Sequence, residues 1–586
     1  MRDILLRNGS VVDGSGAAPY AADVLLSGGR IARIGRDLHA PGAELMDASG
    51  RYILPGFINM HSHADCSVAM YPNMESSLGQ GITTEFAGHC GLGVAPVGEN
   101  WIYMFPEKRA FTRVMPEPIG GINPYQFYTV RTDELRPAFR QAYGEELDWS
   151  TYGEFIAHLK RAGTGCNLAL VAGQSLLRLL AMGLDFRRDA TEDEIRIMED
   201  ALTDAMDAGA MGLGLGLDYQ PSLYASHEEL LRLMKLVARR GGIVTAHTRH
   251  VPNAYYKREV SFHSGLIEFL ELGLESGARV HVSHIQNAFE CKIESDAMAR
   301  AGVEQTLALL EDYRKRGLEV GWDVIPRHAF GPFHYPMAAS MFQPYVEQCG
   351  GVQRFSQLLR TGNYRDILEA EIRGGNHASR GIFTRFNPCT NPAWDTAQRF
   401  IKTKDASLTG KTIREAANGR DSLSFLLDLL SEDPYACVIS LNRRPEHTPD
   451  RDAFVDCSDA CIGLDTWSFD YAAALSEGDL PLECGSPATY CGMTRFLEDQ
   501  RAQRPIGEIV RRLTGNAAER LHLRDRGYIR EGDRADVLLL DPARFKSNEN
   551  LSDPRCGASG LDCVIVNGEI AVRNGAHTHV RSGEIL

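Results

Sequence analysis

The feature that most constrains the fold of this chain is the alternation of short apolar, β-prone runs with longer helical patterns between residues 54 and 518. Such an alternation predicts βα units, in which parallel strands are joined by helices. The expected strands are residues 56–63, 82–90, 168–173, 212–217, 242–249, 280–286, 319–325 and 460–465. These eight strands predict an α/β fold of the closed (β/α)8 TIM-like barrel type.

The two ends of the chain share another pattern, in which short strand-like runs are cut by turn residues. We expect residues 1–54 and 519–586 to form one small β domain, the alternative being two separate β appendages. Residues 55–518 then form the barrel, with insertions near 98–129 and 330–400 where no clear period is visible. Aromatic side chains of the first insertion either roof a pocket or pack it onto the barrel: Trp101, Tyr103, Phe105, Tyr125, Phe127 and Tyr128.

Charge and composition exclude several classes of partner. The 62 Lys and Arg residues against 77 Asp and Glu residues give a net charge of −15, which repels nucleic acids and anionic membranes. The amino terminus lacks the apolar stretch of a signal peptide, and the most apolar run, 166–183, is interrupted by Gln174 and Arg178. The 13 scattered cysteines suit free thiols in a reducing compartment. We therefore expect a cytoplasmic protein without nucleic-acid or membrane partners, whereas assembly into a homo-oligomer stays open.

Four histidines stand at or near the ends of expected strands. His61 and His63 are two residues apart in the first run, so strand alternation turns both imidazoles to one face. His247 and His284 close two consecutive βα units, and active sites of such barrels lie at this edge. Imidazoles converging there predict a metal site, for which zinc is well suited.

Two further residues are candidates for the same site. Cys90 ends the second run, although most buried cysteines only pack. Asp465 ends the last run, where a lone buried carboxylate is costly unless it meets a cation or a donor. We expect Asp465 to face the metal and act as general base and acid, the alternative being a helix cap. His89, expected to point to the opposite face, and the off-register His250 and His281 are given structural roles.

With these residues in place, the chain resembles the amidohydrolase superfamily and, within it, the N-acyl-D-amino-acid deacylase (D-aminoacylase) family. The resemblance covers most of the chain. It rests on LPGFINMHSHAD at 54–65, GITTEFAGHCG at 81–91, GAMGLGLGLDYQP at 209–221, the histidine strands, GLD at 463–465 and the tail segments 526–529 and 532–536. The resemblance implies a barrel accompanied by a small β-sandwich. It also implies one tight zinc on Cys90, His247 and His284, and a second, weaker position formed by His61, His63 and Asp465.

The chain departs from this family in residues expected to bind the substrate. Family members usually carry lysine where this chain has Gln286. They also usually carry a Tyr-Pro-Tyr-like segment where this chain has Ile-Pro-Arg at 325–327. The lysine is an expected partner of the substrate carboxylate, and Arg327 or Arg249 are the candidates to replace it, since guanidinium groups bind carboxylates. We therefore expect poor turnover of simple N-acetyl-D-amino acids.

Together the sequence and the resemblance predict a metal-dependent hydrolase acting on carbon–nitrogen bonds other than peptide bonds. The expected reaction is cleavage of the amide bond of an N-acyl amino acid, or a related small-molecule amide, by metal-activated water. The first alternative is a cyclic-amide hydrolase or a deaminase on the same scaffold. The second is a catalytically silent scaffold protein, which the presence of all six candidate ligands disfavours.

Overall fold

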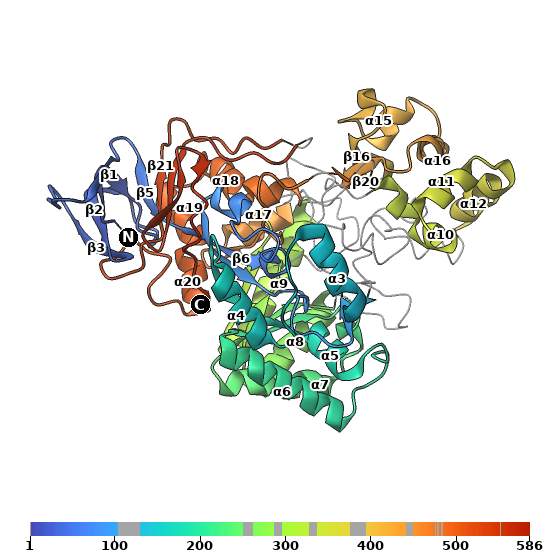
Figure 1. The fold of residues 1–586 in the computed structure, drawn as a ribbon, viewed down its shortest axis with the longest axis horizontal. Coiled ribbons are helices and arrows are strands. Elements are labelled where there is room, and N and C mark those ends of the chain that lie inside the picture. Colours follow the sequence, from blue (N-terminus) through green and yellow to red (C-terminus); the bar gives the residue numbers. More distant parts are fainter. Residues whose placement is uncertain are drawn as a thin grey trace.

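The computed structural model describes residues 2–102, 129–249, 262–285, 296–326, 337–375, 394–440, 449–474, 476–477, 480–481, 485–550 and 553–586. The chain has an α/β fold (Figure 1). In Figure 1 the sheet built from both chain ends lies at one end of the molecule. A central α/β region follows it, and a mostly helical lobe in yellow and orange lies at the other end.

The two ends of the chain join in one nine-stranded sheet, in which β5 pairs antiparallel with β21. Its buried face is apolar and includes Leu6, Val24, Ile53 and Val537. The strands are β1 (Ile4–Val11), β2 (Tyr20–Ser27), β3 (Arg30–Gly35), β4 (Glu44–Asp47), β5 (Tyr52–Pro55), β21 (Val537–Leu540), β22 (Leu561–Val566), β23 (Glu569–Arg573) and β24 (Ala576–His577). A short step from β5 leads the chain into the central region.

Every one of the eight expected runs of the central region contains a strand. The strands are β6 (Phe57–Ser62), β7 (Ile82–Ala87), β10 (Asn167–Leu170) with β11 (Ala172–Gly173), β12 (Gly212–Gly216), β13 (Ile243–His247), β14 (Arg279–Val282), β15 (Val320–Val324) and β18 (Cys461–Ile462). They pair in parallel in the orders β10-β7-β6 and β11-β12-β13-β14-β15-β18. A parallel bridge between Ser62 and Thr466 then connects the first strand to the segment after the last. All carboxyl ends therefore lie at one edge.

Helices separate these strands, as parallel pairing requires. Two of the helices, α4 and α6, begin at capping boxes, in which Thr151 pairs with Glu154 and Thr191 with Glu194. The helices of this region are α1 (Glu75–Leu78), α3 (Thr132–Tyr143), α4 (Tyr152–Ala162), α5 (Gln174–Met182), α6 (Glu192–Ala208), α7 (His227–Arg239), α8 (Phe262–Ser276), α9 (Asp296–Lys315), α17 (Pro449–Asp456), α18 (Pro487–Gln500), α19 (Ile506–Leu513) and α20 (Gly515–Leu521). Short 3-10 turns, η1 (Ala64–Cys66) and η2 (Ser222–Tyr224), follow β6 and β12.

The second expected insertion is a lobe with a hydrophobic cluster of its own, which runs from Met337 to Val438. β16 pairs with β17, so the paired strands and the cluster extend past residue 400, near which the insertion was expected to end. Many of the lobe's helices are short, which explains why the sequence shows no clear period there. Its elements are η3 (Ala338–Phe342), α10 (Gln343–Gln348), α11 (Val352–Leu359), α12 (Gly362–Gly374), α14 (Trp394–Ala397), β16 (Gln398–Lys402), η4 (Ala406–Leu408), α15 (Ile413–Ala417), α16 (Ser422–Glu432) and β17 (Cys437–Ser440).

The first expected insertion is described only at its two ends, where β8 (Asn100–Ile102) pairs with β9 (Thr129–Arg131). Trp101 is buried, and its ring meets that of Trp149 edge to face at 6.0 Å. The other aromatic residues of this insertion lie outside the described residues. A further short hairpin joins β19 (Ser476–Glu477) to β20 (Leu480–Pro481). Among the described residues, no helix combines the length and apolar character needed to cross a membrane.

Candidate metal centre

The structure brings all six expected metal ligands together at the carboxyl ends of the parallel strands. They are His61 in β6, His63 directly after it, Cys90 after β7, His247 at the end of β13, His284 after β14 and Asp465 after β18. They form two groups that share Cys90, and within each group the potential ligand atoms lie within 4.8 Å of one another. Apart from the pair His61 and His63, each candidate ligand comes from a different strand. The strands are parallel, so their carboxyl ends meet at one edge and bring these residues together.

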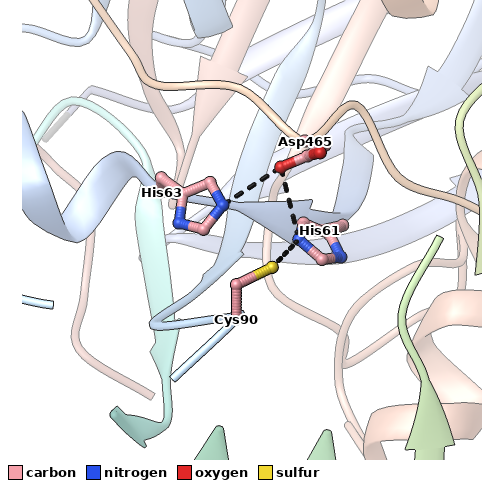
Figure 2. A group of neighbouring side chains, drawn as sticks. All are labelled: His61, His63, Cys90 and Asp465. Atoms are coloured by element: carbon pink, nitrogen blue, oxygen red, sulfur yellow. Dashed lines mark hydrogen bonds and ion pairs between the residues drawn. The ribbon is translucent and has the colours of Figure 1, made fainter. Parts of the chain in front are cut away.

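The first group contains His61, His63, Cys90 and Asp465 (Figure 2). His63 Nε2 lies 3.0 Å and His61 Nε2 3.5 Å from Asp465 Oδ1. The Cys90 sulfur lies 3.5 Å from His61 Nε2. One carboxylate oxygen, one sulfur and two ring nitrogens therefore face a common point.

The second group contains Cys90, His247 and His284. The Cys90 sulfur lies 3.6 Å from His284 Nε2 and 4.0 Å from His247 Nδ1. The two ring nitrogens are 2.9 Å apart. His247 Nε2, on the other side of its ring, faces Asp218 Oδ2 at 3.3 Å.

Three of the candidate ligands have left-handed backbone conformations, with φ of 57° at Cys90, 37° at His284 and 54° at Asp465. Non-glycine residues rarely adopt positive φ, and such strain gathers at functional sites. Each of these residues follows the end of a strand, so the strained turn redirects the side chain toward the cluster. The Asp465 backbone N–H donates to the His61 carbonyl at 2.9 Å, which holds this turn against β6.

Burial and neighbouring charges set the protonation states in the cluster. Burial lowers the pKa of His61 to about 3, and burial together with His247 and His61 lowers the pKa of His284 far below its usual value. For Asp465, burial raises the pKa, but His61 and His63 outweigh that effect and hold it well below its ordinary value. The imidazoles of His61 and His284 are thus neutral and the Asp465 carboxylate is ionised, which are the forms that bind metals.

The residues present fit a zinc ion. Zinc prefers sulfur and nitrogen ligands together with carboxylate oxygen, which is the donor set of this cluster. Burial raises the pKa of the Cys90 thiol, and the carboxylates of Asp465 and Asp323 raise it further, so a nearby cation is needed to stabilise the thiolate. In addition, the buried His63 Nδ1 has no hydrogen-bond partner among the described residues.

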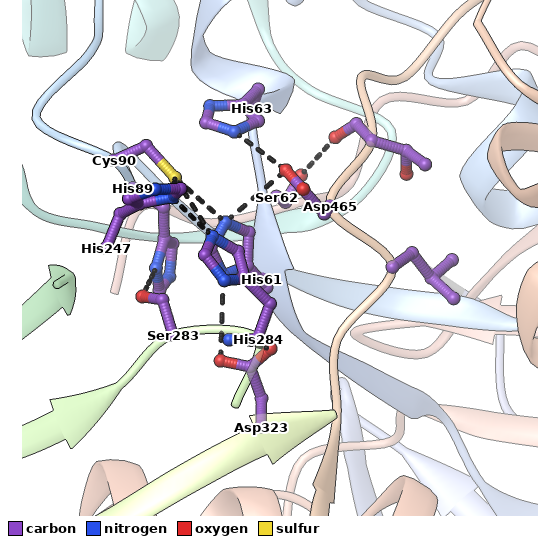
Figure 3. A network of polar contacts seen from close by, with 12 residues as sticks. His61, Ser62, His63, His89, Cys90, His247, Ser283, His284, Asp323 and Asp465 are labelled. Carbon is purple, nitrogen blue, oxygen red and sulfur yellow. Dashed lines mark hydrogen bonds and ion pairs between the residues drawn. The ribbon is translucent and has the colours of Figure 1, made fainter. Parts of the chain in front are cut away.

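His89 does not point to the opposite face, as the strand alternation predicts. Its ring lies against that of His61, with ring centroids 4.1 Å apart, and its Nδ1 is 3.3 Å from the Ser283 hydroxyl (Figure 3). The prediction is wrong because β7 ends at Ala87, and Gly88 then takes a φ of 93°. The strand alternation therefore no longer applies at residue 89.

Three residues contact the candidate ligands without having been predicted from the sequence. Asp218 faces His247, and the Tyr219 hydroxyl lies 2.9 Å from His247 Nδ1. Asp323, inside β15, reaches His61 and the backbone of His284. The signal for Asp323 is present in the sequence, because a carboxylate inside an apolar strand is as costly there as at Asp465.

Of the expected substrate-binding residues, Arg249 alone lies within the described ranges. The guanidinium group of Arg249 binds Glu268 at 3.1 Å and the carbonyls of Leu217, Leu223 and Ala225, so its nitrogens are engaged within the protein. This arrangement argues against Arg249 as the partner of a substrate carboxylate. Gln286 and Arg327 lie outside the described residues, as does His250.

A second network of buried hydrogen bonds lies next to the cluster and involves Asn59 in β6 and Glu85 in β7. The Asn59 amide donates to Glu85 Oε2 at 2.7 Å, and its oxygen accepts from the backbone N–H of Leu464 at 2.9 Å. The Ser77 hydroxyl donates to the other oxygen of Glu85 at 2.6 Å. Burial raises the pKa of Glu85 to about 7, although hydrogen bonds from Ser77, Ser62 and Asn59 reduce the rise. Asn59 thus connects a titratable carboxyl group to the residue that precedes Asp465.

The chain is similar to known proteins in sequence and in fold. The profile of the amidohydrolase family matches residues 44–284. An N-acyl-D-aspartate deacylase of Alcaligenes xylosoxydans xylosoxydans is 24% identical over 598 residues, covering 100% of this chain and 95% of the relative. A dihydroorotase of Solibacter usitatus is 32% identical over 459 residues, covering 75% of this chain and 85% of the relative. The solved structure of a Bordetella bronchiseptica N-acyl-D-glutamate deacylase, complexed with zinc and a phosphonate inhibitor, has a similar fold, with a TM-score of 0.66, 22% identity and coverage of 100% and 99%.

Proposed function

Since this chain belongs to the amidohydrolase family, we propose that it is a zinc-dependent hydrolase that cleaves the amide bond of an N-acyl amino acid or a related N-acyl compound. The observation that carries the proposal is the cluster of one thiol, four imidazoles and one carboxylate at the carboxyl ends of the strands. The full-length likeness to a protein named N-acyl-D-aspartate deacylase supports the substrate class.

Cys90, His247 and His284 would hold the tighter zinc, and His61, His63 and Asp465 would form a second, weaker position. A bound zinc ion lowers the pKa of a coordinated water to about 7 and polarises the substrate carbonyl. Cys90 belongs to both groups, so its sulfur would be within reach of either position. The solved zinc complex of a deacylase with the same fold supports zinc as the metal.

Asp465 is the residue that we assign to proton transfer. Its side chain is 13% exposed, whereas that of His61 is fully buried, so Asp465 is the more accessible of the two to water and substrate. Its low pKa keeps it ionised, and its oxygen can take a proton from the attacking water and return it to the nitrogen of the leaving amine. His63, 3.0 Å away, orients the carboxylate for both steps. No helix begins within residues 466–474, so a helix-capping role has no support.

We further infer that the eight parallel strands close into a (β/α)8 TIM-like barrel within residues 55–518. The bridge between Ser62 and Thr466 supports closure, because it connects the first strand to the segment after the eighth. We also infer a small β-sandwich domain from residues 1–54 and 519–586, whose strands share one sheet. The ten cysteines within the described ranges are free thiols, which supports a cytoplasmic location.

A second candidate function is hydrolysis of a cyclic amide. The likeness to a dihydroorotase, over 85% of that relative, favours it specifically. The same cluster suits this reaction, because ring opening also begins with attack of an activated water on an amide carbonyl. The two candidates therefore differ in the substrate pocket rather than in the metal cluster.

Turnover of a substrate panel decides between these functions. Purified enzyme, stripped of metal with a chelator and then reloaded with zinc, is assayed on N-acyl amino acids of both configurations, on cyclic amides and on aminated heterocycles. We expect zinc-dependent release of free amino acid from N-acyl substrates. Preferred opening of a cyclic amide would replace the first function with the second. Hydrolysis of no substrate class, or hydrolysis unaffected by metal removal, would contradict the proposal.

A further inference from the structure

A fully buried carboxylate, that of Asp323, lies beside His61 and His284 at one side of the cluster (Figure 3). Its Oδ2 accepts a hydrogen bond from the backbone N–H of His284 at 3.0 Å. Its Oδ1 lies 3.0 Å from His281 Nε2 and 3.6 Å from His61 Nδ1. Asp323 thus contacts one member of each ligand group, His61 and His284, although it belongs to neither group.

A chain of donors leads to Asp323 from the side away from the cluster. Arg520 Nε lies 3.4 Å from His281 Nδ1, and the same guanidinium pairs with Glu319 at 3.1 Å. A guanidinium can only donate, so His281 Nδ1 is the acceptor. The hydrogen of the His281 ring is therefore on Nε2, from which it is donated to Asp323. In this order Asp323 accepts at both of its oxygens, from His281 Nε2 at Oδ1 and from the His284 N–H at Oδ2.

The two ring nitrogens of His61 face different neighbours, one on the side of the cluster and one on the side of Asp323. Nε2 lies 3.5 Å from the Cys90 sulfur. The buried Nδ1, which makes no hydrogen bond to a described residue, lies 3.6 Å from Asp323 Oδ1, within ion-pair range but beyond hydrogen-bond distance. A neutral imidazole carries one N–H, and a carboxylate attracts it. With the hydrogen on Nδ1, the lone pair of Nε2 is directed at the cluster, as a metal ligand requires.

Gly463, directly after the neighbouring strand β18, has no side chain, and the Asp323 carboxylate lies in the space that a side chain there would fill. A Cβ atom at Gly463 would lie 2.5 Å from Asp323 Oδ2 and 2.5 Å from the Cβ of His61. Packing alone does not explain a carboxylate here, because an apolar side chain of similar size avoids the cost of desolvation. A role in holding His61 and His284 explains it.

We propose that Asp323, held by His281 and Arg520, is a positioning residue that fixes the tautomer of His61 and the backbone of His284 for metal binding. This inference rests on the proposed metal centre. Asp323 touches neither the substrate nor the reacting atoms in this account. Its effect is on the basicity of the His61 ring and on the position of His284, and it is therefore visible in metal affinity without any assay of activity.

The test is the zinc affinity of purified full-length protein, measured by competition with a chromophoric chelator. Asp323→Asn keeps the shape but removes the charge, and we expect zinc binding to weaken about 10- to 100-fold. Asp536→Asn is the matched control, because Asp536 is also a buried carboxylate that accepts from a backbone N–H, but it pairs with Arg526 directly before β21 of the terminal sheet. We expect it to keep parental zinc affinity even where its stability is reduced.

His281→Gln is a second variant, which removes the ring that donates to Asp323 without changing a ligand. We expect weaker zinc binding in this variant too, with circular dichroism showing that it is folded. A folded Asp323→Asn with parental affinity overturns the inference. If Asp323→Asn does not fold, a folded His281→Gln with parental affinity overturns it. A parental protein that binds no zinc overturns the proposed function itself, so the two failures are distinguishable.

Discussion

His63 Nε2 lies 3.0 Å from Asp465 Oδ1, although the two residues are 402 positions apart in the chain. The backbone produces this proximity, because His63 N–H also donates to the carbonyl of Thr466 at 2.8 Å. The first and last of the parallel strands are therefore neighbours at their carboxyl ends. Their adjacency places the carboxylate that we assign to proton transfer beside the His-x-His pair.

Replacing Asp465 by asparagine should separate proton transfer from metal binding. Asp465→Asn keeps the shape but cannot accept a proton, so we expect kcat to fall on the order of 10²-fold or more. Zinc held by Cys90, His247 and His284 should be retained. Steady-state kinetics and metal analysis of the same preparation measure both quantities.

Asp470→Asn serves as the control for this variant. Asp470 is a partly buried carboxylate five positions further along, and it contacts Asn73 and Glu75 rather than the cluster. We expect its kcat to be close to the parental value. If Asp465→Asn also turned over at the parental rate, the assignment of the base would be wrong, and loss of all zinc would make Asp465 chiefly a ligand.

Glu85 should make the stability of the protein depend on pH. Burial raises the pKa of Glu85 from 4.5 to about 7, so between these values the folded state binds more protons than the unfolded state. Stability contributed by the protonated group is therefore complete below about pH 4.5 and is lost as the pH rises through 7. Replacing Glu85 by a residue that does not titrate should remove this part of the pH dependence of the free energy of unfolding.

Denaturant unfolding of Glu85→Gln and the parent at about pH 5 and about pH 7.5 measures this effect. As the pH rises over this range, the free energy of unfolding of the parent should fall by on the order of 2 kcal/mol more than that of the variant. Glu134→Gln is the control, because the Glu134 side chain is 56% exposed and should leave the parental slope unchanged. Identical slopes in Glu85→Gln and the parent would show that Glu85 is ionised throughout.

Gln286 should limit activity on simple N-acetyl-D-amino acids. By the resemblance to the deacylase family, lysine is expected at this position as a partner of the substrate carboxylate. A hydrogen bond to a charged group contributes about 1.5–3 kcal/mol, equivalent to roughly 10- to 150-fold in binding. We therefore expect Gln286→Lys to raise kcat/KM for these substrates, and efficient turnover by the parent, at about 10⁴ M⁻¹s⁻¹ or more, would refute the prediction.

The strands and the positions of the candidate ligands could be predicted because both signals are local. Each apolar run ends at the residue where a strand meets the carboxyl edge, and strand alternation places His61 and His63 on one face. The parallel order then brings distant strand ends together without further information from the sequence. The same reasoning supplied His247, His284 and Asp465.

What was not predicted depends on backbone turns and distant contacts. The orientation of His89 depends on the positive φ of Gly88, which no alternation rule includes. The role of Asp323 depends on His61 and His281, which come from two other strands. The extent of the helical lobe depends on the pairing of β16 with β17, across a segment without a clear period.

Zinc content tests the central claim of this account most directly. Cys90 and Cys563 are both buried cysteines, but only Cys90 lies among the candidate ligands, whereas Cys563 packs in the terminal sheet. The account predicts at least one zinc per chain in the parent and in Cys563→Ala, and a clear loss of zinc in Cys90→Ala. Equal zinc in the two variants, or active parental enzyme without any transition metal, would contradict it.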